Sequence, residues 1–385
     1  MTSDDTTTTE APTRRDVVKL GSAAAGAGLL AGCTDSLPGD GGSSDGGGDP
    51  TATDTSYTVS MEPVGEVEFD AVPETWVSFT GDWADMGVAL GQAEGLEAVG
   101  IKARYASHYY DELPGVSVDT GAIGELYNEG IDKERFYDIG ADLHVIDPNF
   151  MVNRLGLSES DVTELRENVA PFFGNTSFST VYDWHDGYRH YDLYEAFGKL
   201  AGAFQQEARY EAFAGYHDEV VAAVESRLPE ERPDVAVLFP ADAPPESFYP
   251  YLIGEGTQSK QWRDLGVGDA LGTAGVTDAQ AGGGRIDFET LLDIDPDVLA
   301  VRLQGEVTDE AFEERIVSHL EAHDVASELS AVRNDRVVYG GHTYQGPIIH
   351  LFQLERAAQG VYPDEFGGEQ LFDRQRVADI VDGAV

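Results

Sequence analysis

The sequence predicts an α/β protein in which two Rossmann-like lobes are joined by one long rigid α-helix. Short β-branched apolar runs alternate with helical patterns from Tyr57 onward, which is typical of parallel α/β units. A run without proline, Gln205 to Leu228, then interrupts this alternation and is long enough for a helix that crosses between lobes. A second series of apolar runs and helical patterns follows Pro229 and Pro233, which end the helix.

The first lobe is expected over residues 58–203. Its predicted strands are Trp76–Thr80, Leu96–Ile101, Leu143–Ile146 and Ala170–Phe173, and its predicted helices are Asp82–Gly91, Ser160–Asn168 and Tyr191–Gly202. The connecting helix is expected over residues 204–228 and the second lobe over residues 229–385. The second lobe's predicted strands are Val235–Phe239, Val298–Val301 and Val337–Tyr339, and its predicted helices are Ser259–Leu265, Ile348–Gln359 and Gly368–Ile380.

The charge composition excludes two classes of partner. The chain has 71 Asp and Glu against 24 Lys and Arg, which gives a formal net charge of −47. Nucleic acids and anionic lipid surfaces are bound through clusters of Lys and Arg, so neither is expected as a partner. We interpret the acid as the surface of a halophilic protein, because molar salt screens self-repulsion. A cation-binding face is the alternative. A hydrophobic fraction of 41% is enough for a folded core.

Residues 1–32 have the pattern of an export signal. Arg14 and Arg15 precede a weakly apolar stretch that is too short to span a bilayer, and the stretch ends in Leu-Ala-Gly before Cys33. This pattern resembles a twin-arginine signal with a lipobox, which implies cleavage before Cys33 and lipidation of its sulfur. Cys33 is the only cysteine, so no thiol would remain for other chemistry. The alternative is a buried structural cysteine.

Residues 33–57 follow as a flexible acidic tether rich in Gly and Ser. A lipidated Cys33 would anchor the protein to the outer face of the cell membrane, and the tether would hold the lobes away from that surface.

Three strings in the second lobe resemble a known family. Residues 286–301 contain E-T-L-L-D-I-D-P-D-V-L-A-V, residues 331–339 read A-V-R-N-D-R-V-V-Y, and residues 361–366 read V-Y-P-D-E-F. They are similar to motifs of the substrate-binding proteins of iron–siderophore and cobalamin ABC importers. The resemblance covers the chain from about residue 58 to the end, and the acid-rich surface would suit a haloarchaeal member. In the first lobe, Gly140–Leu143 departs from the family's Pro-Asp.

The resemblance implies a class III periplasmic-binding-protein fold with a ligand between the lobes, no cofactor and no enzymatic activity. It also implies docking to an importer permease through one acidic residue per lobe. Glu289 matches the second-lobe position, and Glu159 is our choice in the first lobe, with Glu164 next. Each is otherwise an ordinary surface glutamate.

Aromatic and arginine side chains follow the predicted strands, where open α/β lobes bind ligands. The first-lobe candidates are Trp83, Arg104, Tyr109, Tyr110, Phe150, Trp184 and Arg189, and the second-lobe candidates are Tyr249, Tyr251, Arg302, His342 and Tyr344. Rings and guanidinium groups suit a large chelate with oxygen atoms on its rim. Trp83 could instead pack within its lobe, Trp184 could belong to a core stripe, and Arg302 could pair with a neighbouring carboxylate.

A ferric siderophore-type chelate is therefore the expected ligand. Cobalamin or haem is the first alternative, and direct binding of a metal ion is the second. No metal site is predicted, because His108, His185, His190 and His342 lack a recognisable ligand spacing. A lipid-anchored hydrolase is the alternative from another class, but the sequence has no G-x-S-x-G, phosphate-loop or metalloprotease motif.

Overall fold

The computed structural model describes residues 56–384. The predicted export signal, with Arg14 and Arg15, lies outside the described residues, as do Cys33 and nearly all of the predicted tether. In the part of the chain that is described, no helix is both long and apolar enough to cross a membrane.

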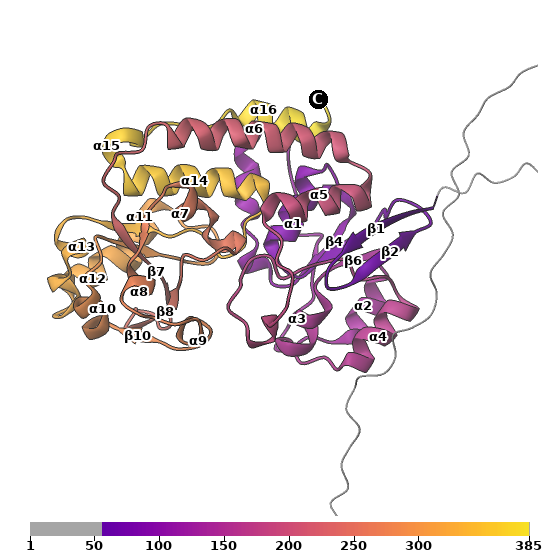
Figure 1. The fold of residues 1–385 in the computed structure, drawn as a ribbon, viewed down its shortest axis with the longest axis horizontal. Coiled ribbons are helices and arrows are strands. Elements are labelled where there is room, and N and C mark those ends of the chain that lie inside the picture. The colour runs from indigo at the N-terminus through magenta and orange to yellow at the C-terminus, as the bar shows by residue number, and fades with distance from the viewer. Residues whose placement is uncertain (1–55, 385) are drawn as a thin grey trace, which may run out of the picture. The chain divides into compact units, whose positions relative to one another are not determined.

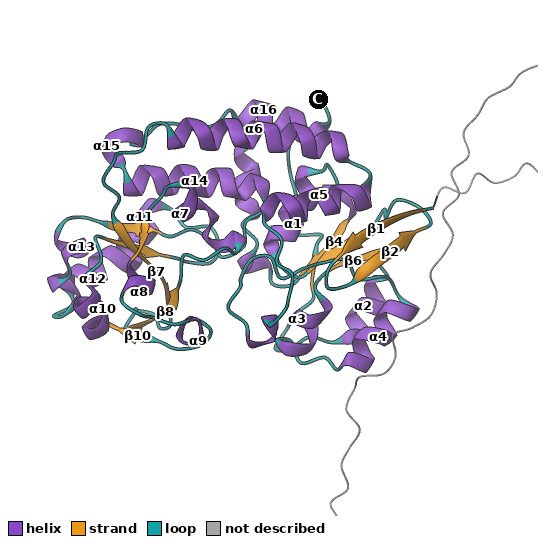
Figure 2. Ribbon diagram, viewed as in Figure 1, coloured by secondary structure: helices purple, strands orange, loops and turns teal. Residues whose placement is uncertain are grey.

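The first lobe contains a four-stranded parallel sheet (Figure 2). Its strands β3 (Trp76–Ser78), β4 (Leu96–Val99), β5 (Gly124–Glu125) and β6 (Leu143–Val145) lie in the order β5-β4-β3-β6. The predicted strand over residues 170–173 is wrong. Only Phe172 pairs with β6, through an isolated bridge to His144. Pro171 has no N–H to donate, which keeps this segment from extending the sheet.

Helices and a hairpin surround this sheet. The helices are α1 (Gly81–Ala89), α2 (Lys133–Ile139), α3 (Pro148–Asn153), α4 (Glu159–Asn168) and α5 (Leu193–Phe204). The hairpin consists of antiparallel strands β1 (Tyr57–Met61) and β2 (Gly65–Phe69), which the sequence interpretation missed. Helix α1 is buried along its whole length, so it lies inside the protein rather than on its surface.

The second lobe has a mixed sheet. Its strands are β7 (Asp234–Pro240), β8 (Ser247–Tyr251), β9 (Gly268–Asp269), β10 (Ile286–Asp287), β11 (Val298–Val301) and β12 (Val337–Tyr339). The order is β10-β8-β7-β11-β12, and β9 pairs with β7. Strands β7, β11 and β12 are parallel, whereas β8 is antiparallel to β7. The predicted strands over residues 298–301 and 337–339 are therefore confirmed, and β8 was missed.

Short helices cover the second sheet. They are α7 (Lys260–Asp264), α8 (Ala270–Thr273), α9 (Asp278–Ala281), α10 (Phe288–Ile294), α11 (Asp309–Phe312), α12 (Ser318–Ala322) and α13 (Ser330–Arg333). The chain ends with α14 (Pro347–Val361), α15 (Pro363–Phe366) and α16 (Arg374–Asp382). The two lobes belong to one compact unit.

The connecting helix is α6 (Glu207–Glu225), which is shorter than the predicted 204–228. Helix α5 continues to Phe204, and Gln205 has a φ of 53° that ends α5 before α6 begins. Helix α6 contributes Phe213 and Val220 to the first lobe's core and Val224 to the second lobe's core. In Figure 1 it extends over both lobes.

A second helix, α14, also contacts both cores. Ile348 and Leu351 in its first half pack in the first lobe's core, and Leu354 and Ala358 in its second half pack in the second lobe's core. Helix α14 lies beside α6 in Figure 1. Two packed helices therefore hold the lobes together, which positions the strand ends of both lobes around one cleft.

Candidate functional site

A cleft of about 530 Å³ opens between the lobes. This volume lies in the range of ligand-binding pockets. The first lobe contributes Arg104, Arg154, Phe178, Ser179, Val181 and Tyr182, and the second lobe contributes residues of β8, the ends of β7 and β11, Gln258, Ala281–Gly283 and residues 341–344. Six of the predicted ligand residues line this cleft. They are Arg104, Tyr249, Tyr251, Arg302, His342 and Tyr344.

Strand β8 places two tyrosines in the cleft. Burial alternates along it, with Phe248 and Pro250 buried and Tyr249 and Tyr251 partly exposed. Because neighbouring strand residues point to opposite faces, this alternation packs one pair into the sheet and turns the tyrosines toward the cleft. The alternation was visible in the sequence, but a central proline argues against a strand. Here β8 lies at the side of the sheet, paired with β7 and only briefly with β10.

Arg302 lines the cleft and follows β11 directly in the chain. It is 1% exposed, its Nη2 donates a hydrogen bond to the backbone oxygen of Gln258, and its guanidinium lies 4.7 Å from the ring centre of Tyr251. Its Nε and Nη1 have no hydrogen-bond partner. Burial lowers the pKa of Arg302 to about 10, so the group is still charged at neutral pH.

The described lining of the cleft differs in charge from the acid-rich chain as a whole. Among the residues that the structure describes, no Asp or Glu lines the cleft. Arg104 and Arg154 are exposed at the first-lobe side, and Arg154 lies 5.5 Å from the ring centre of Tyr182. Within the described range, neither they nor Arg302 forms an ion pair with a carboxylate. The alternative in which Arg302 pairs with a neighbouring carboxylate is therefore wrong.

Two glycines shape the loop after β12. A side chain on Gly340 would lie 2.9 Å from the backbone nitrogen of Arg302, and Gly341 has a φ of 76°, which favours glycine. The turn lets the backbone N–H of His342 donate to Gln353, while the His342 ring contacts the Tyr339 hydroxyl at 3.0 Å. Burial lowers the pKa of His342 to about 3, so this lining residue is a neutral imidazole. Tyr344 packs edge-on against Phe178, 5.0 Å between ring centres.

The loops of the two lobes meet beside the cleft. The backbone N–H of Thr257 donates to the Ser177 oxygen at 2.9 Å, and that of Gln258 donates to the Phe178 oxygen at 3.3 Å. A side chain on Gly256 would lie 2.3 Å from the Phe178 oxygen, so only glycine permits this approach. These hydrogen bonds fix Gln258, which in turn holds Arg302 in place.

Three predicted ligand residues lie in the core instead of the cleft. Trp83, Tyr109 and Tyr110 are at most 2% exposed and do not line the cleft. The Trp83 indole donates to the Asn175 backbone oxygen, and the Tyr110 hydroxyl donates to Asp85 at 2.7 Å. Tyr109 stacks on Phe352 of α14, 4.8 Å between ring centres. Their placement reflects packing against α1 and α14, which the order of the sequence did not reveal.

Phe150, Trp184 and Arg189 also do not line the cleft. Trp184 stacks on Tyr182 at 4.2 Å between ring centres, and Phe150 packs edge-on against Tyr182 at 6.0 Å, so both support a lining residue from behind. Arg189 is exposed and forms an ion pair of 2.7 Å with Glu195. Residues 183–185 form one short turn rather than a long helix, so Trp184 is not part of a helical stripe.

The cleft is also lined by side chains that were not predicted to bind the ligand, among them Arg154, Phe178, Tyr182 and Gln258. Arg154 follows Asp147–Phe150 within one turn and was visible as a nearby arginine. Phe178 and Tyr182 lie in an irregular segment, where no periodic pattern marks the direction of a side chain. Burial raises the pKa of Tyr182 to about 12, so its phenol stays protonated.

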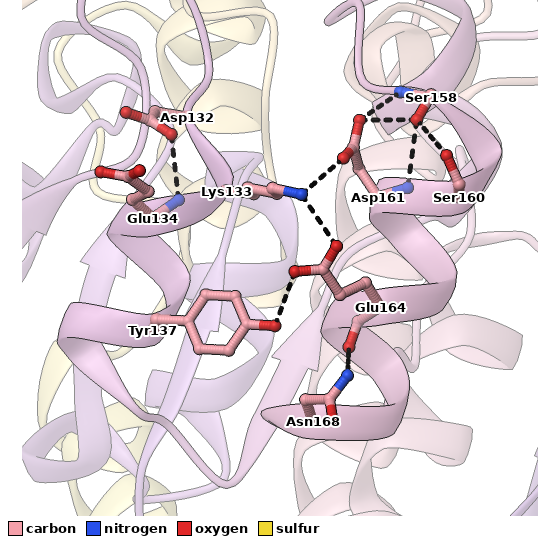
Figure 3. Close-up of polar contacts among 9 residues, drawn as sticks. All are labelled: Asp132, Lys133, Glu134, Tyr137, Ser158, Ser160, Asp161, Glu164 and Asn168. Atoms are coloured by element: carbon pink, nitrogen blue, oxygen red, sulfur yellow. Dashed lines mark hydrogen bonds and ion pairs between the residues drawn. The ribbon is translucent and has the colours of Figure 1, made fainter.

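The two predicted docking residues are exposed near helix N-termini. Glu159 is the first residue of α4 and Glu289 lies in the first turn of α10. Glu164 is engaged elsewhere: its carboxylate contacts Lys133 at 2.8 Å and the Tyr137 hydroxyl at 3.0 Å (Figure 3). The geometry therefore favours Glu159 over Glu164. No group of three or more His, Cys, Asp or Glu within residues 56–384 is arranged to hold a metal ion.

Two α/β lobes around a lined cleft, held by helices that contact both cores, define a ligand-binding protein of two lobes. A family model described as "Periplasmic binding protein" matches residues 144–344. The chain belongs to this family, whose members are extracytoplasmic substrate-binding proteins and not enzymes. The lipid-anchored hydrolase is thereby excluded. A search of curated proteins finds no match.

Solved structures share the fold at low sequence identity. A periplasmic binding protein from Veillonella parvula is 15% identical, with a TM-score of 0.58 over 80% of this chain and 98% of that chain. An iron uptake ABC transporter substrate-binding protein from Streptococcus pneumoniae is 16% identical, with a TM-score of 0.54 over 79% and 98%. A petrobactin-binding protein from Bacillus subtilis is 14% identical, with a TM-score of 0.56 over 80% and 99%. The predicted class III fold is confirmed.

Proposed function

We propose that this protein is the membrane-anchored substrate-binding protein of an ABC importer and that it delivers a ferric siderophore-type chelate. The observation that carries the proposal is the composition of the cleft. Arg104, Arg154 and Arg302 line a space in which the described residues place no carboxylate, although the chain has a net charge of −47. A ligand that presents oxygen atoms on its rim fits such donors.

The aromatic lining supports a chelate of substantial size. Tyr182, Tyr249, Tyr251 and Tyr344 offer ring surface from both lobes, and the cleft volume suits a compact organic ligand around one metal ion. The chelate carries the iron, so the protein needs no metal ligands of its own. A haem-binding cleft would need an iron ligand. Here the His342 ring is 2% exposed and its Nε2 already contacts Tyr339, so a haem would have to take one of the lining tyrosines as its iron ligand.

The proposed route of delivery uses a membrane anchor and a permease. The proposed anchor is a lipid on Cys33 after cleavage of residues 1–32. The proposed permease contacts are Glu159 and Glu289, which belong to different lobes and lie on helices far from α6 in Figure 1. The solved structures of similar fold include proteins described as iron-uptake and siderophore-binding components, which supports this assignment.

Ligand titration tests the proposal. The purified protein, in molar salt, is titrated with ferric catecholate, carboxylate and hydroxamate chelates, with haem and with a corrinoid, and tryptophan fluorescence is recorded. Trp184 stacks on the lining residue Tyr182 and reports on the cleft. We expect saturable quenching by at least one ferric chelate. Saturation only by haem or the corrinoid would reassign the ligand, and no saturation by any compound would refute the receptor function.

A further inference from the structure

The charge of Arg302 has no counter-ion in the part of the chain that the structure describes. The chain has 71 acidic residues, yet no carboxylate lies within ion-pair distance of this buried guanidinium among residues 56–384. The titratable groups that face it are the phenols of Tyr251 and Tyr339 and the imidazole of His342. Burial raises the pKa of the Tyr339 phenol and lowers the pKa of His342 to about 3, so these two groups are uncharged at neutral pH.

A buried charge without a partner destabilises a protein, because water no longer solvates it. Arg302 is nevertheless fixed in place: Gln258 accepts from Nη2, Tyr251 lies against the guanidinium plane, and its own backbone N–H donates to the Leu238 oxygen at 2.8 Å. Nε and Nη1 are buried without a hydrogen-bond partner in a side chain that lines the cleft. An anion in the cleft would supply both the missing charge and the missing acceptors.

We infer that the ligand is a net-anionic ferric chelate, of the catecholate or carboxylate class, whose anionic oxygen atoms bind the free Nε and Nη1 donors of Arg302. This inference rests on the proposed function and specifies its ligand. Electrically neutral trihydroxamate chelates and corrinoids satisfy the donors less well, because their rim atoms carry no full negative charge. Charge-assisted hydrogen bonds are about twice as strong as neutral ones. The cleft should therefore discriminate between chelates by their negative charge.

The first lobe completes the recognition of charge. Arg104 and Arg154 line the opposite side of the cleft and are exposed, so they attract the anion before it reaches Arg302. Because solvent screens these two, they contribute less to affinity than the buried group does. Tyr182 and Tyr251 lie beside the arginines and offer faces for the planar rings of a catecholate.

The experiment compares chelates of similar size and different charge. The intact mature protein is titrated in molar salt with a trianionic ferric tris-catecholate, with ferric citrate and with a neutral ferric trihydroxamate. We expect one of the two anionic probes to bind at least about tenfold more tightly than the neutral probe. Preference for the tris-catecholate identifies the catecholate class, and preference for citrate identifies the carboxylate class.

Matched variants locate the effect. Arg302→Met removes the charge and the free donors, and we expect the preferred anion to lose at least about 30-fold in affinity while the neutral probe changes little. Arg302→Lys keeps the charge but loses the paired N–H donors of the guanidinium. This variant should keep part of the preference for the anionic chelate over the neutral one. Arg376→Met removes the same charge from α16, where Arg376 pairs with Glu219, and should have no effect on binding. Circular dichroism confirms that each variant is folded.

The outcomes separate the two proposals. Equal binding of neutral and anionic ferric chelates, or an unchanged preference in a folded Arg302→Met variant, overturns the inference and leaves the receptor function intact. Failure of every chelate to bind overturns the receptor function, and the inference falls with it.

Discussion

The carboxylate of Asp85 in α1 accepts a hydrogen bond of 2.9 Å from the backbone N–H of Ile348 at the start of α14. The same oxygen accepts from the Ile349 N–H at 3.0 Å, and the other oxygen accepts from the Tyr110 hydroxyl. The first N–H groups of a helix have no partner within the helix, so a buried helix start needs such an acceptor. Asp85 thereby joins the first lobe to a helix that also packs in the second lobe's core.

We expect Asp85→Ala to lower the free energy of unfolding by about 2–3 kcal/mol, because it leaves buried donors without an acceptor. The matched control is Asp373→Ala. Asp373 caps α16 by accepting from Gln375 and Arg376, but at an exposed site, so its loss should cost about 1 kcal/mol. Denaturant unfolding measures both. If both variants lose the same free energy of unfolding, the buried hydrogen bonds of Asp85 stabilise the protein no more than an exposed helix cap does.

A histidine in the first lobe's core predicts sensitivity to acid. His144 is buried between Phe136 and Phe172, neither ring nitrogen has a partner, and burial lowers the pKa of His144 to about 4. The unfolded chain has the ordinary pKa of about 6.5 and binds the proton first. The stability contributed by neutral His144 is therefore complete above pH 6.5 and is lost as the pH falls toward 4, by up to about 3 kcal/mol.

His144→Met should remove this part of the pH dependence. Between about pH 6.5 and pH 4, the wild type should lose unfolding free energy that the variant does not lose. The stability of the variant relative to the wild type should therefore rise as the pH falls. Denaturant unfolding at several pH values gives the difference, which cancels the contribution of other titrating groups. A constant difference across this range would mean that His144 binds a proton in the folded protein as readily as in the unfolded chain, which would contradict the prediction.

Salt should accelerate the capture of an anionic chelate. The net charge of −47 repels such a ligand at long range, whereas Arg104 and Arg154 attract it only close to the cleft. Screening shortens the range of the repulsion from about 30 Å at 0.01 M salt to about 3 Å at 1 M. Stopped-flow fluorescence should show an association rate that rises with salt over the range in which the protein stays folded. A neutral chelate is the control, and a falling rate for the anion would contradict the prediction.

Permease docking is tested by charge reversal. Glu159→Arg and Glu289→Arg should each reduce uptake of the chelate by about tenfold in cells that contain the importer, while ligand affinity stays unchanged. Glu225→Arg is the control, because Glu225 is exposed on α6, away from α4 and α10 in Figure 1. Loss of uptake in this control alone would place the docking face on the helical side of the molecule.

Export and anchoring are tested on the N-terminal segment. Replacement of both Arg14 and Arg15 by Lys should leave unprocessed protein inside the cell, because twin-arginine export depends on this pair.

Cys33→Ser should prevent lipidation, and the protein should leave the membrane fraction. Cell fractionation and intact-mass measurement record both results. Unchanged export of the first variant, or an unchanged membrane fraction for the second, would refute the corresponding assignment.

Much of the fold followed from the sequence because apolar periodicity marks strands and helices directly. The strand ends also located Arg302, Tyr344 and His342 correctly beside the cleft, since residues that follow parallel strands meet at one edge. Tyr109 and Tyr110 were misplaced because α14, which covers this region, comes more than two hundred residues later in the chain. No local pattern reports such a contact.

The most direct test of the proposed binding site is a crystal structure of the protein grown with a ferric chelate that quenches its fluorescence. The proposed arrangement predicts one chelate between the lobes, with anionic oxygen atoms within hydrogen-bond distance of the Nε and Nη1 of Arg302. A chelate bound elsewhere, or one in the cleft that leaves both of these donors unpaired, would contradict it.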